Sequence, residues 1–407
     1  MDATFYEGSL GNPLKVEVAP TAIVKDTTAA PTRAAPPPTR GFLRPLGSEQ
    51  LNSRLTYPLP AGKWTARWQA NLDPDGNPLY LLWSGDRILV QEMLLWELFD
   101  RGGKLIVKVG VGKGEVAIDE ARKLFYAPDP SGMISARKLA DGSVDFRLTA
   151  LMPAGFFRRI YLLGDGRLGL YSSEMQQMAK VLRNPEASTL EVIDIGNPPQ
   201  VDDQHTLTSA KPVGDLLSRT MPFLAAFTSQ GAVVAVQDHL FVTDAQLKII
   251  RDLKDHFIPL AMSLDEAGRI HLIVRDQQGI ALWVMDQNGK RAAARQLGAV
   301  DAPIPPVIGF DHCVYVVQGN GISAFEPDGK VRWEKPLGGR LGGLAVTRDD
   351  KLLASVGADV VAFNAKGERQ VLFSAKGDQL VTAPILTDRE ELLVASKTKL
   401  YCLGTGD

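Results

Sequence analysis

The sequence predicts an all-β protein, and more specifically an eight-bladed β-propeller, from three observations. A pattern of two short β-rich runs separated by a break recurs eight times between Arg87 and the C-terminus. A further β-rich run precedes most copies, and a glycine-containing turn usually follows them. Repeats of about 40 residues that hold several short strands and no regular helix are typical of propeller blades with four strands each.

The repeated runs are predicted to be the two middle strands, B and C, of each blade. The eight copies begin at Arg87, Lys123, Arg167, Gly231, Arg269, His312, Lys351 and Glu391. The copy at Arg167 is the least regular, so seven blades is the alternative count. An inner strand A precedes strand B and often opens with proline or glycine, as in IPLAMSL from Ile258. Proline is tolerated there because the first residue of a strand needs no ladder hydrogen bond from its nitrogen.

The outer strand D follows glycine turns such as PDGK from Pro327. No such strand follows the last copy, which ends at Asp407, but a matching segment lies near the other end of the sequence. GKWTARWQANL from Gly62 parallels GKVRWEKPL from Gly329, and Trp68 corresponds to Trp333. We therefore expect the N-terminal segment to pair with residues 400–403 and to close the ring, which removes an exposed sheet edge.

The run GISAFEPDGKVRW from Gly321, with weaker versions in the other blades, resembles the quinoprotein-like propellers, the family of pyrroloquinoline quinone (PQQ) repeat domains. The resemblance covers about Gly62 to Asp407, or about 43 residues per blade, and eight blades are usual in that family. In its dehydrogenase members, the resemblance implies PQQ stacked between a tryptophan and two adjacent cysteines, beside a calcium ion. Cys313 and Cys402 are not adjacent, and no calcium-ligand set is recognised. We therefore expect no cofactor, no metal and no enzymatic activity.

Residues 1–60 are predicted to form an extended or disordered tail, and residues 61–407 the propeller. The tail is rich in proline and alanine, as in AAPPPTR from Ala34. Within residues 14–18, the apolar side chains alternate with polar or small ones, which is the period of a strand with one apolar face. The apolar positions are Leu14, Val16 and Val18. This strand could add to a sheet edge of a partner protein; the alternative is a disordered leader or a strand that lies back on its own propeller.

Two insertions interrupt the third blade, residues 173–188 and about 198–220. In the first, Met175, Met178 and Leu182 fall at helical spacing and form a candidate partner-binding stripe; the alternative is a helix that packs on its own domain. We assign the first insertion to the B-to-C connection and the second to strand D and its exit. On that assignment both insertions lie on one face of the propeller, and the tail leaves from the opposite face.

Composition excludes several classes of function. The net charge is -2 and no basic tract occurs, so no nucleic-acid partner is expected. No run of 18 apolar residues occurs, so no membrane span is predicted. The first residues, MDATFYEGSLGNP, lack the basic and apolar regions of a secretory signal, and two lone cysteines are typical of buried reduced thiols. We therefore expect a cytoplasmic protein, or a periplasmic one if a leader has been removed.

Motifs that would indicate catalysis are absent from the sequence. The five histidines have no HxH or HExxH spacing, and no Gly-x-Ser-x-Gly elbow occurs. Asp238-His239 and Asp311-His312 could each orient a histidine, but a turn aspartate beside an ordinary strand histidine is the simpler interpretation. The segment from Asp73 to Asn77 is interpreted as a tight turn, not a calcium loop.

The sequence therefore favours a non-catalytic scaffold or assembly subunit that binds other proteins. Two alternatives stay open. One is a propeller that binds a small molecule or performs a reaction in its central channel, where the inner strands converge. The other is an exported envelope-assembly propeller, similar to the outer-membrane assembly lipoproteins of the same family.

Overall fold

The computed structural model describes residues 54–406 except 77, 93–94, 111–113, 130–132, 149–155, 165–166, 175–187, 195–210, 219–223, 229–230, 237, 245 and 301–303. The described residues belong to one unit of the chain, Thr39–Asp407. All 32 named elements of the described residues are β-strands, and they form eight four-stranded antiparallel sheets. The prediction of an all-β chain with eight blades is thus confirmed, and the alternative of seven is wrong.

Each of the first four blades is formed by four strands that follow one another in the sequence. Blade 1 consists of β2 (Pro78–Ser84), β3 (Arg87–Glu92), β4 (Leu95–Asp100) and β5 (Leu105–Gly110). Blade 2 consists of β6 (Ala117–Asp119), β7 (Leu124–Pro128), β8 (Ile134–Lys138) and β9 (Val144–Leu148). Blade 3 consists of β10 (Phe156–Gly164), β11 (Arg167–Glu174), β12 (Ser188–Asp194) and β13 (Lys211–Ser218). Blade 4 consists of β14 (Leu224–Thr228), β15 (Gly231–Val236), β16 (His239–Thr243) and β17 (Ile249–Lys254).

Blades 5 to 7 repeat this order, and blade 8 combines the two ends of the unit. Blade 5 consists of β18 (Ile258–Leu264), β19 (Ile270–Asp276), β20 (Gly279–Met285) and β21 (Arg291–Gln296). Blade 6 consists of β22 (Val307–Ile308), β23 (Val314–Gln318), β24 (Gly321–Phe325) and β25 (Val331–Pro336). Blade 7 consists of β26 (Leu341–Val346), β27 (Leu352–Val356), β28 (Asp359–Phe363) and β29 (Arg369–Ser374). Blade 8 consists of β30 (Ile385–Leu386), β31 (Leu392–Ala395), β32 (Lys399–Thr405) and β1 (Trp64–Asn71).

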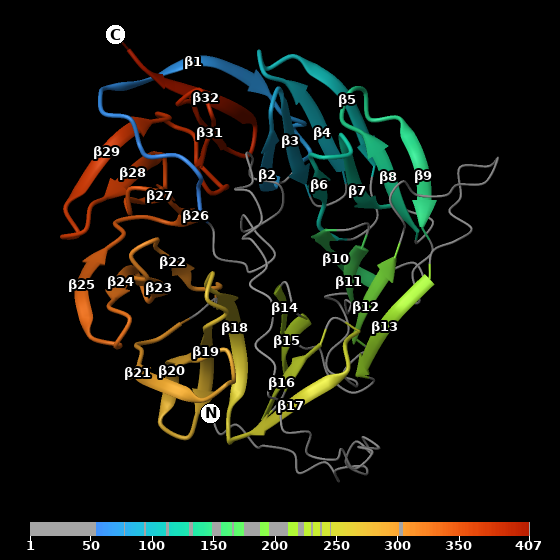
Figure 1. Cartoon of the computed structure of the whole chain (residues 1–407). Helices are drawn as coiled ribbons and strands as arrows, with labels where there is room; N and C mark the ends of the chain where they lie inside the picture. The colour runs from blue at the N-terminus through green and yellow to red at the C-terminus, as the bar shows by residue number, and fades with distance from the viewer. Residues whose placement is uncertain are drawn as a thin grey trace, which may run out of the picture. The chain divides into compact units, whose positions relative to one another are not determined.

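The sheets of this unit follow one another around a ring, with strand A of each blade toward the centre and strand D on the outside (Figure 1). Burial agrees with this order. Middle strands such as β27 are buried at every position, whereas outer strands such as β21 are mostly exposed. Buried apolar side chains of neighbouring blades form shared clusters, for example between blades 4 and 5 and between blades 6 and 7. The core therefore lies between the blades, and each blade needs its neighbours to bury its faces.

The N-terminal strand β1 closes the ring as the sequence predicts. It pairs antiparallel with β32, from Trp64 opposite Thr405 to Asn71 opposite Lys399. Residues at opposite ends of the unit thus share one sheet (Figure 1). The register breaks between Ala66 and Trp68, which marks a β-bulge in the closing strand.

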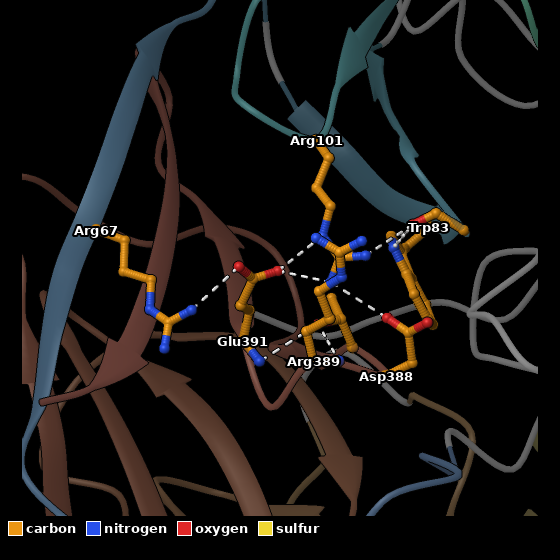
Figure 2. A network of polar contacts seen from close by, with 8 residues as sticks. Arg67, Trp83, Arg101, Asp388, Arg389 and Glu391 are labelled. Carbon is orange, nitrogen blue, oxygen red and sulfur yellow. Dashed lines mark hydrogen bonds and ion pairs between the residues drawn. The ribbon is translucent and has the colours of Figure 1, made fainter. Parts of the chain in front are cut away.

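A network of charged side chains connects blades 8 and 1 beside this closure (Figure 2). Arg101, in the turn after β4, donates from Nε and Nη2 to Oε2 of Glu391 at 3.1 and 2.8 Å. The same Nη2 donates to Asp388 at 3.2 Å, and Arg67 of β1 reaches the other oxygen of Glu391 at 3.3 Å. Glu391 lies in the A-to-B turn of blade 8. Its carboxylate therefore connects this turn to blade 1 through Arg101 and to the closing strand β1 through Arg67.

The two tryptophans that match in the sequence also pack in the same way. An ideal Cβ built on Gly103, in the C-to-D turn of blade 1, would lie 2.6 Å from the ring of Trp68 in blade 8. A Cβ built on Gly367, in the same turn of blade 7, would lie 2.8 Å from the ring of Trp333 in blade 6. Each tryptophan of strand D thus packs against the turn glycine of the next blade, which explains why glycine and tryptophan recur together.

Candidate protein-docking site

The six residues predicted to bind a partner lie outside the described residues. They are Leu14, Val16, Val18, Met175, Met178 and Leu182. The described strands nevertheless fix the chain positions between which the insertions occur. Residues 175–187 connect β11 to β12, which is the B-to-C connection of blade 3 as predicted.

The second insertion is assigned differently by the structure. Most of it, residues 195–210, connects β12 to β13 and is therefore a C-to-D connection, while residues 219–223 form the exit from strand D. In an antiparallel meander the A-to-B and C-to-D connections lie at one end of the strands, and the B-to-C connections at the other. Residues 195–210 lie outside the described residues, so the expectation that both insertions lie on the same face stays a prediction.

Residues 54–59, which the sequence analysis assigns to the tail, pack against the propeller; we call them the docked segment. Arg54 pairs in parallel with Val346, the last residue of the inner strand β26. The amide of Leu55 donates to the carbonyl of Val346 at 2.7 Å, and the amide of Arg348 donates to the carbonyl of Tyr57 at 3.1 Å. The docked segment thus lies alongside the end of the inner strand of blade 7 and pairs with it in parallel.

Apolar contacts accompany these hydrogen bonds. Leu55 and Leu59 are buried, at 2% and 6% exposure. The ring of Tyr57 meets the ring of Trp83, at the end of the inner strand β2, edge to face with 6.5 Å between centroids. The amide of Leu59 donates to Asp349 at 2.9 Å. From this position beside β26, the chain runs outward to β1 (Figure 1).

The Arg54 side chain is held by groups from two further blades. Its Nε donates to the carbonyl of Ile308 at 2.8 Å, and its Nη2 donates to the carbonyl of Gly309. Its Nη1 pairs with Glu266 at 2.8 Å, and its guanidinium lies 4.7 Å above the ring centre of Phe310. The side chain is 7% exposed. The docked segment therefore contacts blades 5, 6, 7 and 1, in each case near the A-to-B connection. We call the face of the propeller that carries these connections the A–B face; the docked segment lies at the inner ends of its blades.

A cluster of buried polar side chains in blade 5 lies next to Arg54 of the docked segment. Asp265, fully buried, accepts from Nε of Arg269 at 2.6 Å, and its Oδ2 lies 3.8 Å from Nε2 of the buried His271. His312, from the A-to-B turn of blade 6, places Nδ1 3.9 Å from the same oxygen. Burial alone would raise the pKa of Asp265, but the contacts with His271 and Arg269 hold it below its usual value. Burial lowers the pKa of His271, so this imidazole is neutral near pH 7.

Sequence reasoning missed this group because Asp265 and His271 match no spacing motif. The two Asp-His dipeptides singled out in the sequence are used differently. His312 faces Asp265 and not Asp311, whose carboxylate instead accepts from the amide of Cys313 and pairs with Arg332. His239 bonds Asp252 of the neighbouring strand through Nδ1 at 2.7 Å, and its Nε2 lies 3.5 Å from Asp238.

The opposite end of blade 1 also buries carboxylates. Glu97, on β4, is 2% exposed, and its Oε2 accepts from the amide of Asp73 at 3.4 Å. Burial raises the pKa of Glu97 to about 7. The segment that begins at Asp73 forms a tight turn, as predicted, in which the Gly76 amide donates to the Asp73 carbonyl at 3.0 Å.

The residues present do not fit the PQQ site that the family resemblance implies. Cys313 and Cys402 are both free and buried, and they lie in blades 6 and 8. Burial raises the pKa of each thiol to about 12, so neither is a reactive thiolate at neutral pH. Within the described part of the chain, no three His, Cys, Asp or Glu side chains are grouped so that they could hold a metal ion.

Comparison with known proteins identifies the fold. No family model and no curated protein matches this sequence. Among solved structures, BamB from Moraxella catarrhalis is similar at a TM-score of 0.56 with 13% identity, over 84% of this chain and 97% of that one. A quinohemoprotein alcohol dehydrogenase from Comamonas testosteroni is similar at a TM-score of 0.61 with 12% identity, over 90% of this chain and 81% of that one. The computationally designed Ika8 protein is similar at a TM-score of 0.56 with 12% identity, over 82% and 98%.

These similarities support a PQQ-like β-propeller fold, in agreement with the resemblance noted in the sequence. At such low identity they show the fold alone, because one fold carries many functions. Among the described residues, no helix has the length and apolarity needed to cross a lipid bilayer.

Proposed function

We propose that this protein is a non-catalytic scaffold or assembly subunit whose ligands are other proteins. The observation that carries the proposal is the docked segment at the centre of the A–B face. Small-molecule sites of propellers are expected where inner strands converge, and here the chain itself covers the inner ends of blades 5, 6, 7 and 1. Backbone pairing of the docked segment with the end of β26 supports the proposal, because it is the type of contact that an extended peptide makes with a strand.

The two predicted partner-binding segments enter the chain at different places. The stripe of Met175, Met178 and Leu182 falls in the sequence between β11 and β12, the B-to-C connection of blade 3. The tail strand of Leu14, Val16 and Val18 precedes the docked segment in the sequence. We propose that the stripe and the tail strand hold different partners, so that the propeller brings them together.

Substitutions at the proposed surfaces test this function. Changing Met175, Met178 and Leu182 to Ser should abolish stoichiometric capture of a partner from native lysate. If the stripe is a binding surface, the melting temperature should stay within about 2 °C, because substitutions at a surface cost little stability. Gln176→Ser with Gln177→Ser is the matched control in the same insertion and should capture normally. A large drop in melting temperature would instead assign the stripe to the core.

A matched pair of variants tests the tail in the same way. Leu14, Val16 and Val18 to Ser should weaken capture, whereas Lys15→Ser with Glu17→Ser, on the other face of the predicted strand, should not. Equal capture by both variants would contradict a role for the apolar face of residues 14–18.

The buried group around Asp265 favours a second candidate, a propeller that binds a small molecule or carries out an unrecognised reaction. Buried carboxylate and imidazole groups with shifted pKa values cluster at functional sites, and one similar structure is an alcohol dehydrogenase by name. A small molecule that raises the melting temperature of the wild type, but not of His271→Leu, would favour this candidate.

The compartment is a separate proposal. We place the protein in the cytoplasm because both described cysteines are free and buried; export to the periplasm, with a role in envelope assembly, is the alternative. Fractionation of cells that express the gene with its native upstream sequence distinguishes the two compartments.

A further inference from the structure

The group that holds Arg54 has the composition of an arginine-recognition site. Two carbonyl oxygens, one carboxylate and one aromatic face surround the guanidinium, from Ile308, Gly309, Glu266 and Phe310. Nε and Nη2 donate to the two carbonyls, Nη1 lies 2.8 Å from Glu266 as an ion pair, and the ring of Phe310 lies against the flat face of the guanidinium. A planar guanidinium satisfies these directions at once, whereas a lysine ammonium presents a single point charge.

The backbone and the leucines of the docked segment add a second level of recognition. Main-chain pairing with Val346 and Arg348 fixes the segment as an extended strand, and this pairing is independent of side-chain identity. Leu55 and Leu59 supply the buried apolar area. Peptides that add to a sheet edge are read in this way, with backbone bonds for affinity and side-chain pockets for specificity.

The arginine site is built by residues that hold one another without Arg54. The carbonyl of Gly309 lies in a turn closed by its own amide, which donates to the carbonyl of Cys313 at 2.8 Å. The amide of Asp311 donates to Asp350 of blade 7 at 3.0 Å, which ties the turns of blades 6 and 7 together. The same site can therefore accept an arginine from another chain when Arg54 is absent.

We propose that the centre of the A–B face is a docking site for an extended, arginine-bearing peptide, which the chain fills with its own residues 54–59. A partner segment in which an arginine is followed by leucines competes with the docked segment for this site. The inference rests on the proposed function as a protein-binding propeller, and it names the class of partner segment that the A–B face selects.

The test uses the full-length chain and the peptide Arg-Leu-Thr-Tyr-Pro-Leu, which copies residues 54–59 and carries a fluorophore. In full-length Arg54→Ala the competing arginine is missing, so the peptide should bind at least about tenfold more tightly than to the wild type, measured by fluorescence anisotropy. A peptide with lysine in place of arginine should bind at least about tenfold more weakly. Equal binding of the two peptides, or no binding to Arg54→Ala, would overturn the proposal.

A second measurement does not depend on the folding of Arg54→Ala. Arg54→Lys keeps the charge and the aliphatic stem, so the chain should fold, but the lysine cannot engage both carbonyls and Glu266 in the same way. The amide of Leu55, which donates to Val346, should then exchange with deuterium at least about tenfold faster than in the wild type. Unchanged exchange in Arg54→Lys would contradict arginine recognition.

Neither measurement needs a natural partner, so their outcomes are separate from those of the capture experiments. If the peptides fail and capture succeeds, the protein is a scaffold that does not read arginine at this site. If the peptides bind as predicted and capture fails, the arginine site stands while the proposed function does not.

Discussion

Gly103 and Gly367 each hold a C-to-D turn against a tryptophan of the preceding blade. Both have positive φ, +82° and +74°, and both lack room for a side chain because Trp68 and Trp333 lie under 3 Å from an added Cβ. Gly103→Ala should therefore carry two costs, about 1–2 kcal/mol for the left-handed backbone and about 1–3 kcal/mol for overpacking. Denaturant unfolding measures the sum.

A third glycine separates the two costs. Gly338 has a φ of +76° and nothing within 4 Å of an added Cβ, so Gly338→Ala should carry only the backbone cost. If Gly103→Ala proves no more destabilising than Gly338→Ala, the packing of blade on blade through Trp68 is not a stabilising contact.

Glu97 makes stability depend on pH. Burial raises its pKa from 4.5 to about 7 in the folded protein, so the folded state binds this proton more tightly than the unfolded state does. The stabilisation of the folded state by this proton is therefore fully present below about pH 4.5 and is lost as the pH rises through 7. The free energy of unfolding falls by at most about 3 kcal/mol over this range. Glu97→Gln should gain stability relative to the wild type between pH 5 and pH 8, measured by urea unfolding, whereas Glu334→Gln, at an exposed position, should show no such change.

Single residues also show how far the sequence predicts the structure. The match of Trp68 with Trp333 is visible in the sequence because both occupy the same place in a repeated motif. The contact of Arg54 with Ile308 cannot be predicted from the sequence, because these residues are 254 positions apart and meet only when the ring is closed. The contact between Asp265 and His271 was not predicted for a different reason. The alternating pattern of a strand predicts that His271 is buried, but it does not indicate which side chain His271 contacts.

At the scale of elements, Glu391 connects the last blade to the first. It lies at 12% exposure, contacts Arg101 and Arg67, and sits beside the strand that closes the ring. Hydrogen bonds to charged groups contribute about 1.5–3 kcal/mol when partly buried. Glu391→Gln should therefore lower stability by about 1–2 kcal/mol in calorimetric unfolding.

The exposed pair of Lys330 and Asp328 provides the control for this element. Its side chains are 82% and 54% exposed, so Asp328→Asn should leave the stability unchanged within experimental error. Equal effects of the two substitutions would show that the network in Figure 2 is an ordinary surface ion pair.

The elements themselves were largely predictable, but their connections were less so. The alternation of apolar residues and the glycine turns identify the middle strands of all eight blades, including β11 and β12 of the irregular third blade. Strand D of that blade, β13, has no Gly-Lys turn before it, so the sequence alone gives no bounds for this strand.

At the scale of the whole molecule, the N-terminal boundary of the propeller is a test of the fold. From the sequence alone, removal of residues 1–59 should leave the propeller folded. The docked segment adds a loss of stability to this expectation, because Leu55 and Leu59 are buried and burial of a leucine contributes about 1.5–3 kcal/mol. A chain that begins at Arg54 should melt like the full-length protein, one that begins at Pro60 several degrees lower, and one that begins at Asp73, without β1, lower still.

Equal melting temperatures for the chains that begin at Arg54 and Asp73 would contradict closure through β1 and β32. Such a result would mean that the ring is held by contacts between neighbouring blades alone, without the shared sheet of blade 8.

The central functional claim is that this propeller binds proteins. The most direct measurement is affinity capture from native lysate with two forms in parallel, the full-length chain and a chain that begins at Arg54 and keeps the docked segment, each quantified by mass spectrometry. The account predicts a stoichiometric partner on the full-length chain that is lost or reduced when residues 1–53 are removed. If neither form retains a protein at stoichiometric amounts, while a small molecule raises the melting temperature of both, the scaffold function is contradicted and the small-molecule alternative takes its place.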